Sequence, residues 1–157
     1  MNTLISPAQA ICLAFPDGEY LPAGTLTETD IAAAEERCIV PVIGRALYEK
    51  TLSGACEELR LRYLAAPTAL CTRLSVQPRL DIRTGRCGTT APRPDDAQPA
   101  PADALARLQK RLRQQATALL RRATDYLETH AGDYPVYDPR CNILNRCTTD
   151  GGLVQTR

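Results

Sequence analysis

The sequence predicts a mainly α protein, a small helical bundle with one long late helix. Apolar residues recur at helical intervals in several stretches, and only 4% of the 157 residues are aromatic, so Leu, Ala, Ile and Val must build the core. That composition favours helices over sheets. We expect a single domain over residues 1–157. Its predicted parts are an N-terminal arm (1–26), a helical body (27–131) with a mobile loop (85–102), and an extended C-terminal tail (132–157).

The N-terminal arm is rich in helix breakers. Its prolines and glycines leave room for a short helix around Ala8–Ala14 and for little other regular structure. The stretch has no basic n-region, and Pro7 and Gln9 interrupt its apolar run, so we expect no signal peptide. No stretch approaches the roughly 20 apolar residues of a membrane span, so we expect a soluble protein with no membrane contact.

An apolar corner follows, and we expect it to pin the core. Pro41 lacks a backbone N–H and restricts the residue before it, so one helix should end near Ile39 or Val40 and the next should begin at Pro41. Val40, Ile43 and Leu47 recur at intervals of three and four and should face inward. The predicted structural corner consists of Ile39, Val40, Pro41, Val42, Ile43, Gly44, Leu47 and Tyr48.

The next helix is predicted over residues 56–77. It carries apolar residues on two sides, which is typical of a central, buried helix. Pro67 predicts a kink or a break after Ala66. Leu80 and Ile82 then alternate with charged residues, so a short strand or β-hairpin could form around residues 78–90. Residues 85–102 are rich in Gly and Pro and are expected to form the flexible loop.

The clearest element is a helix over Asp103–His130, of roughly 40 Å at about 1.5 Å per residue. Asp103 is the expected N-cap, and Gly132 with Pro135 should stop the helix. One arc of the helix is apolar: Leu105, Leu108, Leu112, Ala116, Leu119, Ala123, Tyr126 and Leu127. The opposite side is basic: Arg107, Lys110, Arg111, Arg121 and Arg122.

The sequence contains no pattern that predicts catalysis. His130 is the only histidine, and it should pack or meet the carbonyls at the end of the long helix. Cys38 and Cys71 should act as small apolar fillers, and seven cysteines, an odd number, indicate free thiols. Residues 85–88 favour a turn over an anion-binding loop. Because no nucleophile, base and orienting group come together, we assign no catalytic, cofactor-binding or metal-binding residues and expect no enzyme.

Charge is unevenly distributed along the chain. Residues 1–58 carry 3 basic and 9 acidic side chains, residues 59–122 carry 13 and 4, and residues 123–157 carry 3 and 5. Three interpretations stay open: contacts within the chain or between subunits, a nucleic-acid surface, or no role. Arginines suit phosphate and carboxylate contacts. The candidate interaction residues are Arg79, Arg83, Arg86, Arg93, Arg107, Arg111, Arg121 and Arg122.

The order of these segments carries a resemblance. An acidic helix precedes IVPVIGRALYEK, a central helix contains Tyr63-Leu-Ala-Ala-Pro67, and PRLDIRTG leads to a long helix that closes with Tyr-Leu-Glu. Over most of Thr25–Tyr137 this order resembles the small helical head-tail connector, or head-completion, proteins of tailed phages and prophages. More closely, it is similar to an uncharacterised group of such proteins in prophages and mobile elements of gut bacteria, in which a PvIG..LY corner recurs. The seven cysteines and the Pro-rich loop depart from the pattern.

The resemblance implies a non-enzymatic virion assembly protein. Such connectors form a homo-oligomeric ring docked beneath the portal, with helices packed between subunits, so portal and tail proteins, and packaged DNA, are the implied partners. The implied location is the cytoplasm of the bacterial host, and the virion where the prophage is active. The alternative, from the residues themselves, is a small nucleic-acid-binding regulator that uses the basic side of the long helix.

Overall fold

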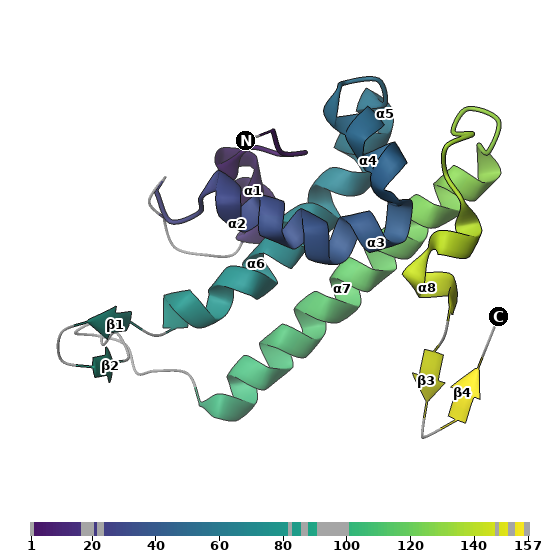
Figure 1. Ribbon diagram of the computed structural model, residues 1–157. Coiled ribbons are helices and arrows are strands. Elements are labelled where there is room, and N and C mark those ends of the chain that lie inside the picture. Colours follow the sequence, from purple (N-terminus) through teal and green to yellow (C-terminus); the bar gives the residue numbers. More distant parts are fainter. Residues whose placement is uncertain are drawn as a thin grey trace.

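The computed structural model describes residues 2–16, 21, 24–81, 83–85, 88–90, 101–146, 148–150 and 153–155. The mainly α class is confirmed (Figure 1). The helices are α1 (Pro7–Ala14), α2 (Glu28–Ala34), η1 (Glu35–Ile39), α3 (Val40–Ile43), α4 (Arg45–Leu52), α5 (Glu57–Leu59), η2 (Arg60–Leu64), α6 (Ala65–Asp81), α7 (Ala102–Thr129), η3 (Pro139–Cys141) and α8 (Ile143–Arg146). Two antiparallel hairpins pair β1 (Arg83–Gly85) with β2 (Gly88–Thr90) and β3 (Thr148–Asp150) with β4 (Leu153–Gln155). Within the described ranges, no helix combines the length and apolarity needed to cross a membrane.

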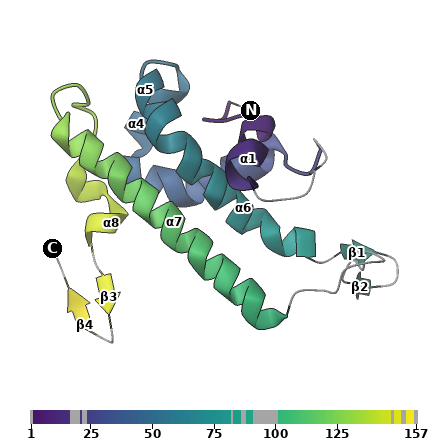
Figure 2. The same cartoon turned by 180° about the vertical axis from the view of Figure 1, so that it is seen from behind.

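Helix α6 lies at the centre of the bundle, as predicted. It contacts α7 on one side and α1 and α2 on the other (Figures 1 and 2). Thr68 and Thr72 are fully buried on it, and their hydroxyls donate to the carbonyls of Leu64 and Thr68 at 2.7 and 2.9 Å. Buried polar side chains are thus satisfied within the helix, which leaves its surface free to pack on three neighbours.

The predicted corner is buried, but the chain bends at Gly44 and not at Pro41 as predicted. Ile39, Val42, Ile43, Leu47 and Tyr48 belong to the main core cluster, and Val40 packs against it. The backbone stays helical through Pro41, and the bend occurs at Gly44, where φ is +83° and ψ is 152°. Only glycine adopts that conformation without strain, so Gly44 and not Pro41 separates the two helices.

A π-helical turn lets the helix pass through Pro41. In η1 the backbone N–H of Val40 donates to the carbonyl of Glu35, five residues back. A proline ring ordinarily collides with the carbonyl four residues earlier, and a wider turn moves that carbonyl away. The prediction that the first helix ends near Ile39 or Val40 is therefore wrong.

The same device precedes Pro67. In η2 the N–H of Ala65 donates to the carbonyl of Arg60, and α6 then runs without a break to Asp81. The predicted break after Ala66 is wrong, and so is a strand beginning at Pro78, because residues 78–81 are helical. The hairpin predicted near residues 78–90 is present, but it starts at Arg83.

Helix α7 confirms the long helix, with Pro101 and not Asp103 as its N-cap. His130 is the C-cap residue: its backbone N–H donates to the Tyr126 carbonyl, its Nδ1 lies 2.9 Å from the same oxygen, and its ring packs on Tyr126. The buried side of α7 carries Leu112, Ala116, Leu120, Ala123, Thr124 and Leu127. Leu105, Leu108 and Leu119, predicted on the apolar arc, stay partly exposed.

The N-terminal segment and the part of the tail up to α8 are tied to the body. The predicted helix near Ala8–Ala14 is α1, capped by Ser6, and the preceding Leu4 and Ile5 are buried. The tail prediction is corrected, because η3 and α8 are helical. Asn142 is fully buried and its Nδ2 donates to the Tyr137 hydroxyl at 3.1 Å, which anchors the tail on the main core.

Candidate interaction surfaces of the long helix

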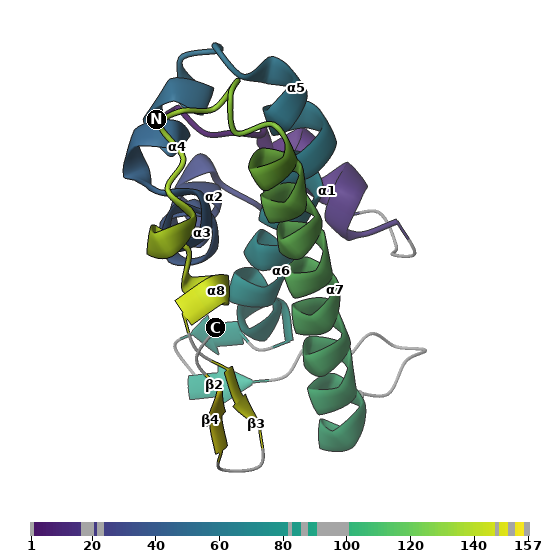
Figure 3. The ribbon, with the colours of Figure 1, turned by 90° about the vertical axis from the view of Figure 1, so that its right-hand side faces the viewer.

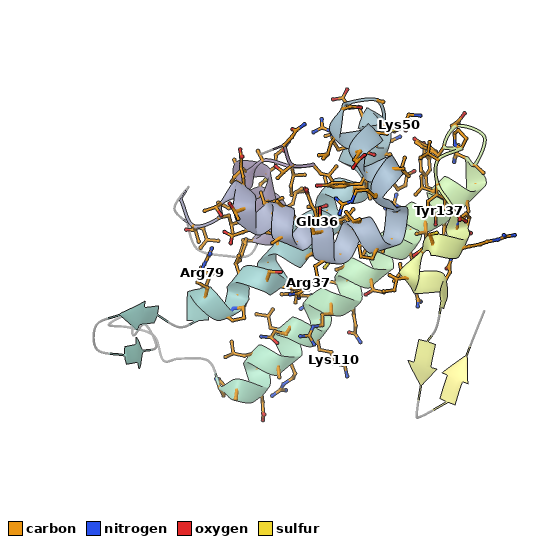
Figure 4. All side chains as sticks on the ribbon, viewed as in Figure 1. Glu36, Arg37, Lys50, Arg79, Lys110 and Tyr137 are labelled. Carbon is orange, nitrogen blue, oxygen red and sulfur yellow. The ribbon has the colours of Figure 1, made fainter. Side chains whose placement is uncertain are left out.

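The outer side of α7 forms a basic strip, which we define as Arg107, Lys110, Arg111, Arg121 and Arg122. At 100° per residue these side chains share one arc of the helix, opposite the buried residues. All five are exposed. Figure 3 shows α7 running along the outside of the bundle, and Figure 4 shows Lys110 on the half of the helix that extends beyond the body. The fold therefore confines the buried residues of α7 to one side and turns its cations toward solvent.

Carboxylates of the described residues do not neutralise the basic strip. Four ion pairs occur among the described residues, and none includes a cation of α7. Arg122 lies over the ring of Tyr63, 5.7 Å from its centroid, and Arg107 donates to the carbonyl of Asp103. Both contacts leave the positive charge of the arginine in place. The strip is thus a surface suited to an anionic partner.

An apolar groove borders the strip, between α1, α6 and α7. Its volume is about 550 Å³. Its apolar lining includes Leu13, Ala66, Leu70, Leu108, Leu112 and Leu119. Leu13 is 43% exposed. Arg111 lines the groove and also belongs to the basic strip, so the two surfaces are continuous.

Three carboxylates of the acidic N-terminal segment, those of Asp30, Glu35 and Glu36, are used inside the fold. Arg79 binds Asp30 through two nitrogens, at 3.0 and 2.9 Å, and lowers the pKa of that carboxyl. Arg45 binds Glu36 in the same two-pronged manner and lowers its pKa. Glu35 is fully buried. The predicted interaction residue Arg79 is therefore a structural residue, which joins the end of α6 to the start of α2.

Glu35 is the centre of a buried polar network. Its carboxylate accepts the backbone N–H of Leu4 at 2.7 Å and the hydroxyl of Tyr48 at 2.7 Å. Arg60 also binds Leu4, because its guanidinium donates to the Leu4 carbonyl at 3.1 Å. Burial raises the pKa of Glu35, and it also raises the pKa of Tyr48, whose hydroxyl donates to the carboxylate. The network fixes the N-terminal segment to η1 and α4.

Two cysteine thiols meet where η1 packs on α6. Cys71 is buried with Ala34 and Ala116, and Cys38 packs against this cluster, as the filler prediction expects. A hydrogen bond from the Cys71 thiol lowers the pKa of Cys38, and the same bond together with burial raises the pKa of Cys71. No group of three His, Cys, Asp or Glu side chains gathers within the part of the chain that the structure describes.

The structure brings together four of the eight predicted interaction arginines: Arg107, Arg111, Arg121 and Arg122. Arg83 lies in β1, and Arg86 and Arg93 lie outside the described residues, as does much of the predicted loop 85–102. Neither the Glu35 network nor the apolar groove was predicted from the sequence. The sequence did contain a signal for the Glu35 network, since Glu35 lies four residues from both Ile31 and Ile39 and so shares their apolar side of the helix.

The fold and these surfaces define a small α-helical protein whose long helix presents a cationic and an apolar face to solvent. Residues 39–146, more than half of the chain, match the model of a family of unknown function, DUF6712. The chain therefore belongs to this family. Comparison with curated proteins and with solved structures gives no match.

Proposed function

We propose that this protein is a non-enzymatic assembly component, a head-tail connector of a tailed phage or prophage that acts by self-association and by docking to portal and tail proteins. The resemblance of the corner, central helix and long helix to connector proteins motivates the proposal. The observation that carries it is the exposure of α7. This helix contributes one side to the core, and its other sides form the basic strip and the apolar groove.

The energetics of the groove support a role in association. Leu13, Leu108 and Leu119 are large apolar side chains that this fold leaves partly in water. Burial of apolar surface contributes about 25 cal/mol per Å², so a partner that covers these leucines gains stability from each of them. Contiguous apolar surface next to polar side chains is typical of protein-protein interfaces.

The experiment is size-exclusion chromatography with light scattering on the full chain, alone and mixed with a portal protein from the same genome. The proposal predicts a discrete oligomer or a stable complex with the portal. A chain that stays monomeric at every concentration and does not bind the portal would contradict the proposal. Flanking portal, capsid and tail genes would support it independently.

The basic strip favours one alternative function, a nucleic-acid-binding regulator. Its five cations lie within residues 107–122, about 22 Å of helix from the first to the last, which is enough to reach several phosphates of a duplex. Fluorescence anisotropy with duplex DNA at increasing salt separates the two functions. A DNA-binding protein should lose affinity steeply as salt rises, whereas a protein-docking surface should bind the duplex weakly at all salt concentrations.

A further inference from the structure

We infer that the groove between α1, α6 and α7, together with Arg111 at its edge, is a docking site for an acidic amphipathic helix of a second protein. This inference rests on the proposed role in assembly, and it deepens that role by naming the chemistry of one partner. The shape of the groove, the charge beside it and the state of this chain's own carboxylates each contribute to the argument.

The groove has the dimensions of a helix-binding site. The α7 side of the groove runs from Leu108 to Leu119, about 17 Å from the first residue to the last, which corresponds to about three turns of a bound helix. Leu13 of α1 and Leu70 of α6 complete its lining. An amphipathic helix fills such a groove with side chains spaced three and four residues apart.

Charge selects an acidic helix. Arg111 lines the groove, and Arg107 and Arg122 of the basic strip lie on the same side of α7. None of these three forms an ion pair with a carboxylate of the described residues. Arg73, the other cation of the groove, is held in place, since it donates to the Ala14 carbonyl and stacks on the ring of Phe15. A partner with carboxylates beside its apolar stripe would complement this edge, and a basic partner would be repelled.

The two most acidic segments of the described chain, α2 with η1 and α5 with η2, use most of their carboxylates within the fold. The acidic helix α2 and the turn η1 that follows it use Asp30, Glu35 and Glu36 within the fold. In α5, Glu57 and Glu58 pair with Arg60 and Arg62. A second copy that docked through these segments would exchange existing ion pairs for new ones and gain little electrostatic free energy. A different protein with unpaired carboxylates would gain new ion pairs at the basic strip.

The probe is a fluorescent synthetic helix of about four turns, with Leu at positions spaced three and four residues apart and Glu elsewhere. Its binding to the full chain is measured by anisotropy. A scrambled peptide of the same composition and a version with Lys in place of Glu are the peptide controls. We expect the acidic helix to bind, and the scrambled and Lys versions to bind at least about tenfold more weakly.

Two exposed positions test the site without disturbing the core. Leu13→Glu and Arg111→Glu should each weaken binding of the acidic helix about tenfold, and the Lys peptide should recover affinity for Arg111→Glu. The matched controls are Leu61→Glu, at a leucine that is 48% exposed on η2, and Lys50→Glu on α4. Both controls should bind like the wild type, and thermal melts should show that all four variants are folded.

Each contrary result overturns the inference. If the wild type does not bind the acidic peptide, the groove is not a docking site for an acidic helix. The same conclusion follows if Leu13→Glu and Arg111→Glu bind the peptide as tightly as the wild type does. Loss of self-association in these two variants assigns the groove to a second copy. Binding that appears only after residues 91–100, which contain Asp95 and Asp96, are replaced by a Gly-Ser linker assigns it to the chain's own segment.

The two proposals fail in distinguishable ways. A chain that binds the acidic helix but neither self-associates nor binds a portal keeps the docking site and loses the connector role. If the chain assembles with the portal but does not bind the peptide, the connector role is supported and the docking site is excluded.

Discussion

Removal of the Glu35 carboxylate should destabilise the fold more than the loss of any exposed charge, because two donors lose their acceptor at once. Glu35→Ala leaves the N–H of Leu4 and the hydroxyl of Tyr48 without partners in a buried site. A hydrogen bond to a charged group contributes about 1.5–3 kcal/mol, so two contribute about 3–6 kcal/mol before any offset. Burial of a carboxylate itself costs free energy, and Glu35→Ala removes that cost. The expected net loss of folding stability is therefore about 3 kcal/mol.

A graded series of variants separates these contributions. Glu35→Gln keeps the volume and one acceptor oxygen and should cost about 1 kcal/mol, whereas Tyr48→Phe removes one donor and should cost about 1–2 kcal/mol. Glu36→Gln is the matched control, since it changes the neighbouring glutamate, whose side chain is 50% exposed, and should alter stability little. Urea denaturation with linear extrapolation measures all of these values.

The pH dependence gives a second readout of the same network. Burial raises the pKa of Glu35 above its usual 4.5, so the folded chain holds a proton on this group more tightly than the unfolded chain does. The stability that protonation adds is complete below pH 4.5 and is lost as pH rises through the folded pKa. Glu35→Gln has no carboxyl group at this position, so its stability lacks this pH dependence. The wild type should therefore gain stability relative to Glu35→Gln as the pH falls from 7 toward 5.

Either of two results would refute this reasoning. If Glu35→Ala unfolds at the same urea concentration as Glu36→Gln, or if the difference between wild type and Glu35→Gln does not depend on pH, the buried network does not hold the N-terminal segment. Loss of the Leu4 contact without loss of global stability would instead show that this segment unfolds locally.

Three further predictions concern other parts of the fold. Gly44→Ala should cost about 1–3 kcal/mol in urea denaturation, since φ is +83° there, whereas Gly132→Ala, whose φ is not positive, should be close to neutral. Cys71→Ala removes the hydrogen bond that lowers the pKa of Cys38, so alkylation of Cys38 at pH 7, followed by mass spectrometry, should become slower. Leu127→Ala, at a fully buried position of α7, should cost about 2–5 kcal/mol in the same denaturation experiment.

The sequence was sufficient for the elements that periodicity and composition determine. The long helix, the central position of α6, the burial of the corner and the capping role of His130 all followed from the spacing of apolar residues and from known preferences at helix ends. In each case the local pattern and the tertiary packing favour the same structure.

The two wrong predictions of helix ends at prolines share one physical cause. Pro41 and Pro67 indicate helix ends when each is judged from its neighbours alone, but the core on both sides favours continuous helices. A π-helical turn before each proline removes the conflict. Helix propensity is weak beside tertiary packing, so the turn type could not be read from the residues. The groove was missed for a related reason, because it depends on how three separated helices meet.

We propose that other proteins bind the solvent side of α7. Hydroxyl-radical footprinting with mass spectrometry can compare Leu13, Leu108 and Leu119 in the isolated chain and in the particle formed with the portal protein. We predict that these leucines become protected on assembly, while the exposed Val136 and Ile143 of the tail serve as internal references. Unchanged oxidation of all three leucines in an assembled particle would contradict the claim.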